Sequence, residues 1–169
     1  LARDLEEQRT IFKNELRLET GSLKSSILER LSLHFSSYMT SGGFLKAIND
    51  LAQTKTIPHA TYRTYVQWII GDMLKRGKNE KYLREIIEAL TTRLAKQVSW
   101  HNITASISID HHQTVADYLQ LLERMDVLQI IPALREDKLR AAPKKAKKIH
   151  FNDPFIFYSL YSWVFNEKD

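Results

Sequence analysis

The chain has 169 residues, of which 43% are hydrophobic, 10% aromatic and 27% charged, and its net charge is +5. This length and composition allow one good core or two small ones and exclude wholesale disorder. The absence of cysteine excludes disulfides and thiolate metal sites. No apolar run approaches the roughly 20 residues that span a bilayer, and no signal peptide is recognisable, so we expect a cytoplasmic protein.

The first half of the sequence predicts helices that alternate with short turns. A loose apolar stripe extends from Leu5 to Leu18, and Gly21-Ser22 is a natural break with Ser22 as a candidate cap. Apolar residues at helical intervals predict a helix over residues 23–38, which the two glycines of Ser41-Gly42-Gly43 should end. Further helices are predicted over residues 44–51, 61–74 and 82–98.

Turn and cap residues mark the boundaries between these helices. Pro58 lies in a connector over residues 53–59. Gly77 should close the helix over residues 61–74, because glycine tolerates the left-handed conformation at a helix end. Asn79 is placed to cap the helix that follows.

The last third of the sequence changes character. A short helix over residues 99–106 and a turn over 107–112 precede a longer helix over 113–125, with Asp110 and Gln113 as a candidate capping pair. Two β-type runs, residues 127–134 and 146–151, bracket a basic loop. Asp153 should cap a final helix that Pro154 opens and that ends near Phe165.

This order of elements predicts a mainly α fold with one β-hairpin. A helix that leads into a strand, a charged loop and a returning strand is the layout of a winged helix-turn-helix. We therefore predict a helical domain over residues 1–98 and a winged-helix domain over residues 99–169.

The positive charge is concentrated in the predicted wing. Between Arg135 and Lys148 there are seven basic and two acidic residues, and seven minus two gives +5, the net charge of the whole chain. Such a segment attracts polyanions, although a charge-rich loop is more often simply solvated.

Four segments carry a family resemblance. They are YMTSGGF at residues 38–44, TYRTYVQWIIGDMLKRG at 61–77, QTVADYLQLLERMDVLQIIPAL at 113–134 and KKIHFNDPFIFYSL at 147–160. Together they resemble the predicted AAA-type ATPases of bacteria and archaea, in which a P-loop domain is followed by a helical lid, a winged helix and a nuclease-like domain. The most specific motif positions are Gly42, Gly43, Asp153 and Pro154.

The resemblance implies that this chain is the lid and winged-helix portion of such a protein. The sequence contains no GxxxxGK[ST] motif, so ATP and magnesium would bind elsewhere in the parent protein. The expected partners are the missing ATPase core and the C-terminal domain. Because no serine-histidine-acid or paired-carboxylate pattern occurs, we expect no enzymatic activity and no cofactor in this fragment. A lid arginine could contact nucleotide, and Arg63 and Arg76 are candidates, but a solvated helix arginine is the favoured interpretation.

Two functional hypotheses follow. The favoured one is a coupling module that passes the nucleotide state of the ATPase to a partner or substrate. The alternative is a winged-helix DNA-binding module, in which the first turn of the second helix faces the major groove and the wing contacts phosphates. Its candidate contacts are His112, Gln113, Thr114, Arg140, Lys144, Lys145, Lys147 and Lys148. Asp117 and Glu123 would repel phosphates, which makes the helix a poor reader of DNA.

Two further groups of residues have competing interpretations. Zinc could be bound by His101, Asp110, His111 and His112. Adjacent histidines cannot readily direct both rings at one ion, so we expect no metal. A base-stacking platform could be formed by Phe155, Phe157, Tyr158, Tyr161, Trp163 and Phe165. A core face plus an interface is favoured for this helix, and the fragment should then self-associate through its apolar surface.

Overall fold

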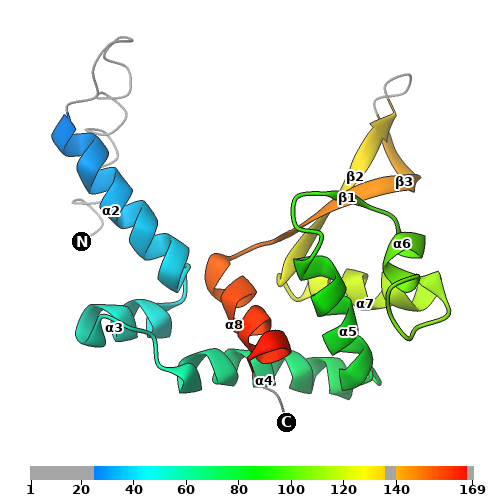
Figure 1. Ribbon diagram of the computed structural model, residues 1–169, viewed down its shortest axis with the longest axis horizontal. Helices are drawn as coiled ribbons and strands as arrows, with labels where there is room; N and C mark the ends of the chain where they lie inside the picture. The colour runs from blue at the N-terminus through cyan, green and yellow to red at the C-terminus, as the bar shows by residue number, and fades with distance from the viewer. Residues whose placement is uncertain (1–24, 136–139, 167–169) are drawn as a thin grey trace. The chain divides into compact units, whose positions relative to one another are not determined.

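The computed structural model describes residues 25–135 and 140–166 and is mostly helical (Figure 1). The predicted mainly α class is therefore confirmed. The chain divides into two compact units, residues 1–38 and 39–169. In chain order the elements are α2 (Ser25–Ser41), α3 (Leu45–Thr54), α4 (His59–Lys75), α5 (Glu80–Thr91), β1 (Gln97–Val98), α6 (Trp100–Thr104), α7 (His112–Arg124), β2 (Leu128–Arg135), β3 (Arg140–Phe151) and α8 (Pro154–Phe165).

The first unit is described only through α2. The predicted helix over residues 23–38 is confirmed for its described part, and α2 continues to Ser41. Leu33 and Phe35 on this helix are 69% and 63% exposed. The predicted stripe from Leu5 to Leu18 and the predicted break at Gly21-Ser22 lie outside the described residues.

Local signals predicted most helix ends of the second unit correctly. Gly42 and Gly77 have φ angles of 55° and 70°, which glycine adopts without steric cost. The Asn79 side chain accepts a hydrogen bond from the Tyr82 backbone N–H and so caps α5. The Asp153 side chain accepts one from the Phe155 N–H, and Pro154 lies in the first turn of α8.

Two predicted boundaries were wrong. The helix predicted over residues 82–98 ends at Thr91, and residues 97–98 form β1. The apolar stripe of α5 is complete by Leu90, which is buried, whereas Leu94 is 39% exposed and adds nothing to the core. The predicted cap at Asp110 is also absent, because the N-cap of α7 is His111 and makes no side-chain hydrogen bond.

The three strands form one antiparallel sheet in the order β1-β3-β2. On β3, Lys148 pairs with Gln97 of β1 and with Ile131 of β2. The register shifts between Pro132 and Ala133, where proline cannot donate a ladder hydrogen bond. The second predicted strand is longer than expected, since β3 begins at Arg140 rather than near residue 146.

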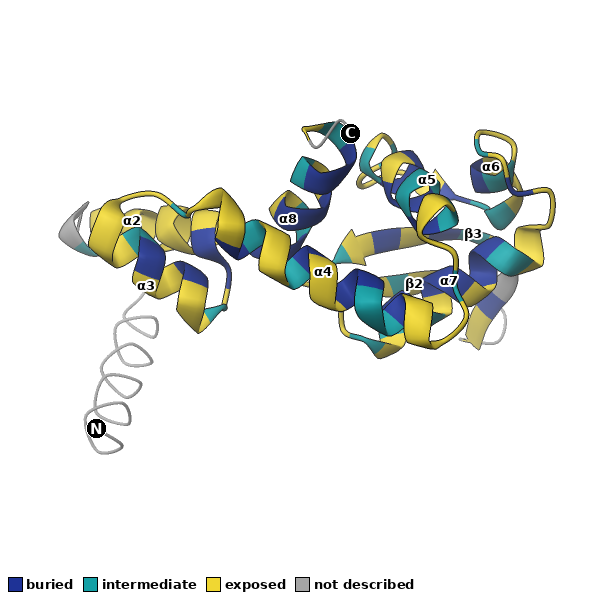
Figure 2. Cartoon of the chain, turned by 90° about the horizontal axis from the view of Figure 1, so that it is seen from below, coloured by how far each residue is buried: buried dark blue, intermediate teal, exposed yellow. Residues whose placement is uncertain are grey.

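The second unit has a continuous hydrophobic core. Helix α8 packs against α4 and α5, and α6 packs against α7 (Figure 1). Figure 2 shows buried positions on each of these elements, and the core includes Ile87 and Leu90 of α5 together with Ile103 of α6. The domain boundary predicted between residues 98 and 99 stays a prediction, although buried residues on both sides of it belong to this one core.

Candidate functional site

The sheet is strongly cationic. None of the residues in β1, β2 and β3 is acidic, whereas β3 alone carries Arg140, Lys144, Lys145, Lys147 and Lys148. At the far end of the hairpin Arg140 pairs directly with Arg135, which is the cross-strand arrangement of like charges that destabilises a sheet. A surface with this charge distribution favours an anionic partner.

The burial of the lysines differs sharply along β3. Lys147 is only 8% exposed; its Nζ lies 4.5 Å from the centroid of the Trp100 ring and donates to the Lys145 carbonyl at 3.0 Å. Burial lowers the pKa of this lysine, because desolvation disfavours the charged form. Lys147 shares its side of the strand with buried Ile149, whereas Lys148 and His150 are exposed.

Of the other wing candidates, Arg140 and Lys145 are exposed, while the side chain of Lys144 is outside the described part. Among the described ion pairs, none involves Arg140, Lys145 or Lys148. These three cations are exposed, and none of them has a carboxylate at ion-pair distance within the described ranges. The period of two along a strand distinguishes the two lysines from sequence alone. Lys147 lies two residues before apolar Ile149, whereas Lys148 lies two residues before polar His150.

The N-terminal turn of α7 is polar but internally bonded. His112 and Gln113 are exposed and Thr114 is partly buried. The Gln113 amide donates to the Asp117 carboxylate at 3.1 Å. Glu123 accepts the Ile130 backbone N–H at 2.8 Å and so fixes the start of β2. Carboxylates repel phosphates, so these two acids weaken α7 as a nucleic-acid contact.

No metal site is found within the described ranges, since no group of three or more His, Cys, Asp or Glu side chains could hold an ion. His101, Asp110, His111 and His112 are all exposed. No helix among the described residues is both long and apolar enough to cross a membrane.

The motif residues Gly42 and Gly43 lie next to the motif residue Asp153. The Gly43 backbone N–H donates to Oδ2 of Asp153 at 2.8 Å, although 110 residues separate the two. Oδ1 of the same carboxylate accepts the Phe155 N–H at 2.8 Å. Gly42 lies so close that an added Cβ would stand 2.5 Å from Cγ and 2.6 Å from Oδ2 of Asp153. One carboxylate therefore joins the turn after α2 to the first turn of α8, a contact that we name the Gly43–Asp153 latch.

An aromatic cluster around Phe155 lies next to the latch. Phe155 is fully buried, and its ring centroid lies 5.2 Å from Phe44, 5.0 Å from Tyr62 and 5.1 Å from Tyr65. Burying a phenylalanine side chain contributes about 1.5 to 3 kcal/mol, and aromatic pairs add to this. The latch and the cluster thus fix the turn before α3 to α8.

The remaining aromatic residues of α8 divide between the core and the surface. Trp163 is buried, whereas Tyr158 and Tyr161 are each 42% exposed. The surface rings contact one another, with Phe157 and Tyr161 at 5.9 Å and Tyr161 and Phe165 at 4.6 Å. The buried side of α8 fits the predicted core face, and the predicted interface on its exposed side stays a prediction.

Neither arginine proposed for nucleotide contact is in a distinctive environment. Arg63 is exposed on α4. Arg76 is also exposed, and its Nη1 donates to the Asp72 carbonyl at 3.1 Å, near the C-terminal end of the same helix.

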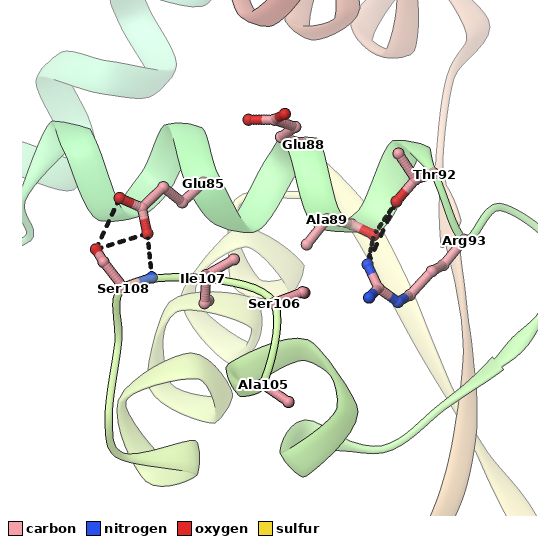
Figure 3. Close-up of a pocket in the computed structure, with 9 residues that line it drawn as sticks. All are labelled: Glu85, Glu88, Ala89, Thr92, Arg93, Ala105, Ser106, Ile107 and Ser108. Carbon is pink, nitrogen blue, oxygen red and sulfur yellow. Dashed lines mark hydrogen bonds between the residues drawn. The ribbon is translucent and has the colours of Figure 1, made fainter.

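A groove of about 590 Å³ lies between α5 and the loop over residues 105–108 (Figure 3). Burial raises the pKa of Glu85, but hydrogen bonds from the Ser108 hydroxyl and N–H together with the charge of Lys81 outweigh it, so the net shift is downward. Arg93 donates to the Ala89 carbonyl and to the Thr92 hydroxyl. No buried side-chain nitrogen or oxygen in the described part of the chain lacks a hydrogen-bond partner, so the groove offers no unsatisfied buried side-chain group to a ligand.

One family model matches most of the chain. A family model described as a domain of unknown function (DUF8612) matches residues 29–166. The chain belongs to this family. The match includes both partners of the latch and the whole hairpin. Searches of curated proteins and of solved structures found no match.

Proposed function

We propose that this chain is the lid and winged-helix portion of an AAA-type ATPase and that it couples the nucleotide state of the parent to a partner or substrate. The winged-helix assignment is supported by the order of elements from α5 to β3, which is helix, strand, helix, helix, strand, strand. The sheet order β1-β3-β2 is also typical of a winged helix. In this scheme α7 is the second helix of the helix-turn-helix and the β2–β3 hairpin is the wing.

The Gly43–Asp153 latch is the observation that carries the coupling proposal. A module that transmits a conformational state needs a rigid connection between the segment that moves and the element that responds. Helix α2 ends one residue before Gly42, and the latch ties that point to the start of α8. The hairpin leads into α8 through only two residues, Asn152 and Asp153. A displacement of the α2 end would thus reach the hairpin through α8.

The proposal assigns ATP and magnesium to a P-loop domain outside this sequence and assigns no catalytic residue to this chain. We expect the coding sequence upstream of Leu1 to contain a GxxxxGK[ST] motif between a strand and a helix. The longer polypeptide should bind ATP, and the present chain alone should not. An upstream sequence without a P-loop would overturn the assignment.

A further inference from the structure

We infer that the outer surface of the β2–β3 hairpin binds the phosphate backbone of nucleic acid through Arg140, Lys145 and Lys148. This inference is independent of the coupling proposal, because it depends on the charge and register of the sheet and not on the latch. The first support is the absence of any acidic residue from the three strands. A solvated charged surface normally mixes both signs, whereas the charged residues of these strands are all basic.

The register gives Arg140 and Lys148 a spacing that suits a phosphate backbone, whereas Lys145 lies within residues 143–146, which have no paired partner on β2. Lys148 is opposite Ile131 and Arg140 is opposite Arg135, so four residues of β2 separate the two levels. At about 3.3 Å per residue the levels are roughly 13 Å apart along the hairpin. One strand of B-DNA carries a phosphate about every 3.4 Å of axis, so this distance spans about four phosphates.

The neighbours of these cations are suited to a polar backbone. Gln97 and Gln129 are exposed and lie opposite Lys148 and His150, where side-chain amides can donate to phosphate oxygens. The exposed large hydrophobic residues of β2 are Ile131 and Leu134, at 43% and 56%. Two large side chains do not make the broad apolar face that inserts into a bilayer, so nucleic acid is favoured over an anionic membrane.

The structure also limits which groups take part. Lys147 is directed inward over Trp100, and the first turn of α7 carries the bonded pair Gln113 and Asp117. Contacts confined to the hairpin would be with phosphates rather than with bases. Binding should therefore be independent of sequence and strongly dependent on salt.

The test is fluorescence anisotropy of the 169-residue chain with a labelled 20-base-pair duplex at 50 and 200 mM salt. Three phosphate contacts predict a slope of about −2.7 in log affinity against log salt, which is about a 40-fold loss over this fourfold change in salt. In the variant Lys145→Ala/Lys148→Ala the loss should fall to about 3- to 4-fold, because one contact remains. The matched control, Lys55→Ala/Lys75→Ala, removes two exposed cations that lie outside the sheet and should retain the wild-type slope.

Circular dichroism of each variant establishes that it is folded before binding is compared. Two duplexes of unrelated sequence should bind equally well, within about twofold. The inference is overturned if the wild-type chain does not bind duplex at 50 mM salt, or if the hairpin variant keeps the wild-type slope. It is also overturned if vesicles rich in anionic lipid bind the chain through Lys145 and Lys148 while the duplex does not.

Discussion

Replacing Gly42 by alanine should destabilise the protein far more than replacing any other described glycine. Gly42 has a φ of 55°, which costs an alanine about 1 kcal/mol. The added Cβ would also stand 2.5 Å from Cγ of Asp153, so the carboxylate must move. That movement breaks the hydrogen bond from Gly43, and bonds to a charged group are worth about 1.5 to 3 kcal/mol. Loss of the cap on α8 adds about 1 kcal/mol.

These contributions predict a total loss of about 3.5 to 5 kcal/mol for Gly42→Ala. The assay is thermal and urea unfolding of the 169-residue chain, followed by circular dichroism. At about 2 to 4 °C per kcal/mol for a chain of this size, the midpoint should fall by about 7 to 20 °C. The slope of the urea transition should not change, because the folded and unfolded states expose the same surface as before.

The other described glycines are internal controls. Gly77→Ala meets the same φ strain with no atom within 4 Å, so it should cost only about 1 kcal/mol. Gly43→Ala has a Cβ 3.6 Å from Oδ2 of Asp153, an ordinary contact, and should cost less than about 1 kcal/mol. Gly71→Ala lies within α4 in open space and should stabilise the chain by about 0.5 to 1 kcal/mol.

A double-mutant cycle isolates the carboxylate contribution. In an Asp153→Ala background the clash is absent, so Gly42→Ala should cost only the strain of about 1 kcal/mol. The reasoning is refuted if Gly42→Ala costs no more than Gly77→Ala, or if its cost is the same with and without Asp153.

Four further outcomes are expected. Lys147→Met should leave duplex affinity within about twofold, because Lys147 is buried over Trp100. Lys148→Ala should instead lower the slope of log affinity against log salt by about 0.9. Equal effects of the two substitutions would contradict the assignment of Lys147 to the buried side of β3 and Lys148 to the exposed side. The pKa of Asp50 is lowered, first by the hydrogen bond from Lys46 and then by that from Thr61. This stabilisation is present above the unfolded-state pKa and is lost as the pH falls through the folded-state pKa, so Asp50→Asn should flatten the acid side of a stability-against-pH curve. Asn79→Ala should cost about 1 kcal/mol in urea unfolding through the lost cap of α5, and an unchanged midpoint would count against that cap. Sedimentation at high concentration should detect self-association through the exposed aromatic residues of α8, which Tyr158→Ser/Tyr161→Ser should reduce.

Features encoded by neighbouring residues were predictable from the sequence. The cap at Asn79, the Asp153-Pro154 start of α8 and the glycine end at Gly77 depend on interactions within a few residues, and each was found where predicted. The helix predicted to Val98 failed for the opposite reason. Residues 97–98 form a strand because β3 pairs with them, and a two-residue strand has no periodicity of its own.

The candidate site was only partly predictable. The family resemblance indicates Gly42, Gly43 and Asp153 as motif positions, but no local pattern indicates that residues 110 positions apart share a hydrogen bond. Charge counting alone groups the basic residues of the hairpin into one charged loop. Along β3, Lys147 shares one side of the strand with Ile149, and Lys148 shares the other side with His150. The period of two therefore predicts that Lys147 is buried and that Lys148 is exposed.

The most direct test of the coupling proposal is hydrogen exchange of the longer polypeptide, with and without ATP. We predict that ATP changes the protection of amides in α8 and the β2–β3 hairpin, and that Asp153→Ala abolishes this change while ATP affinity is retained. The wild-type Gly43 amide, which donates to Asp153, should itself be protected. Equal responses to ATP in the wild type and in Asp153→Ala, or no response in α8 and the hairpin, would contradict coupling through the latch.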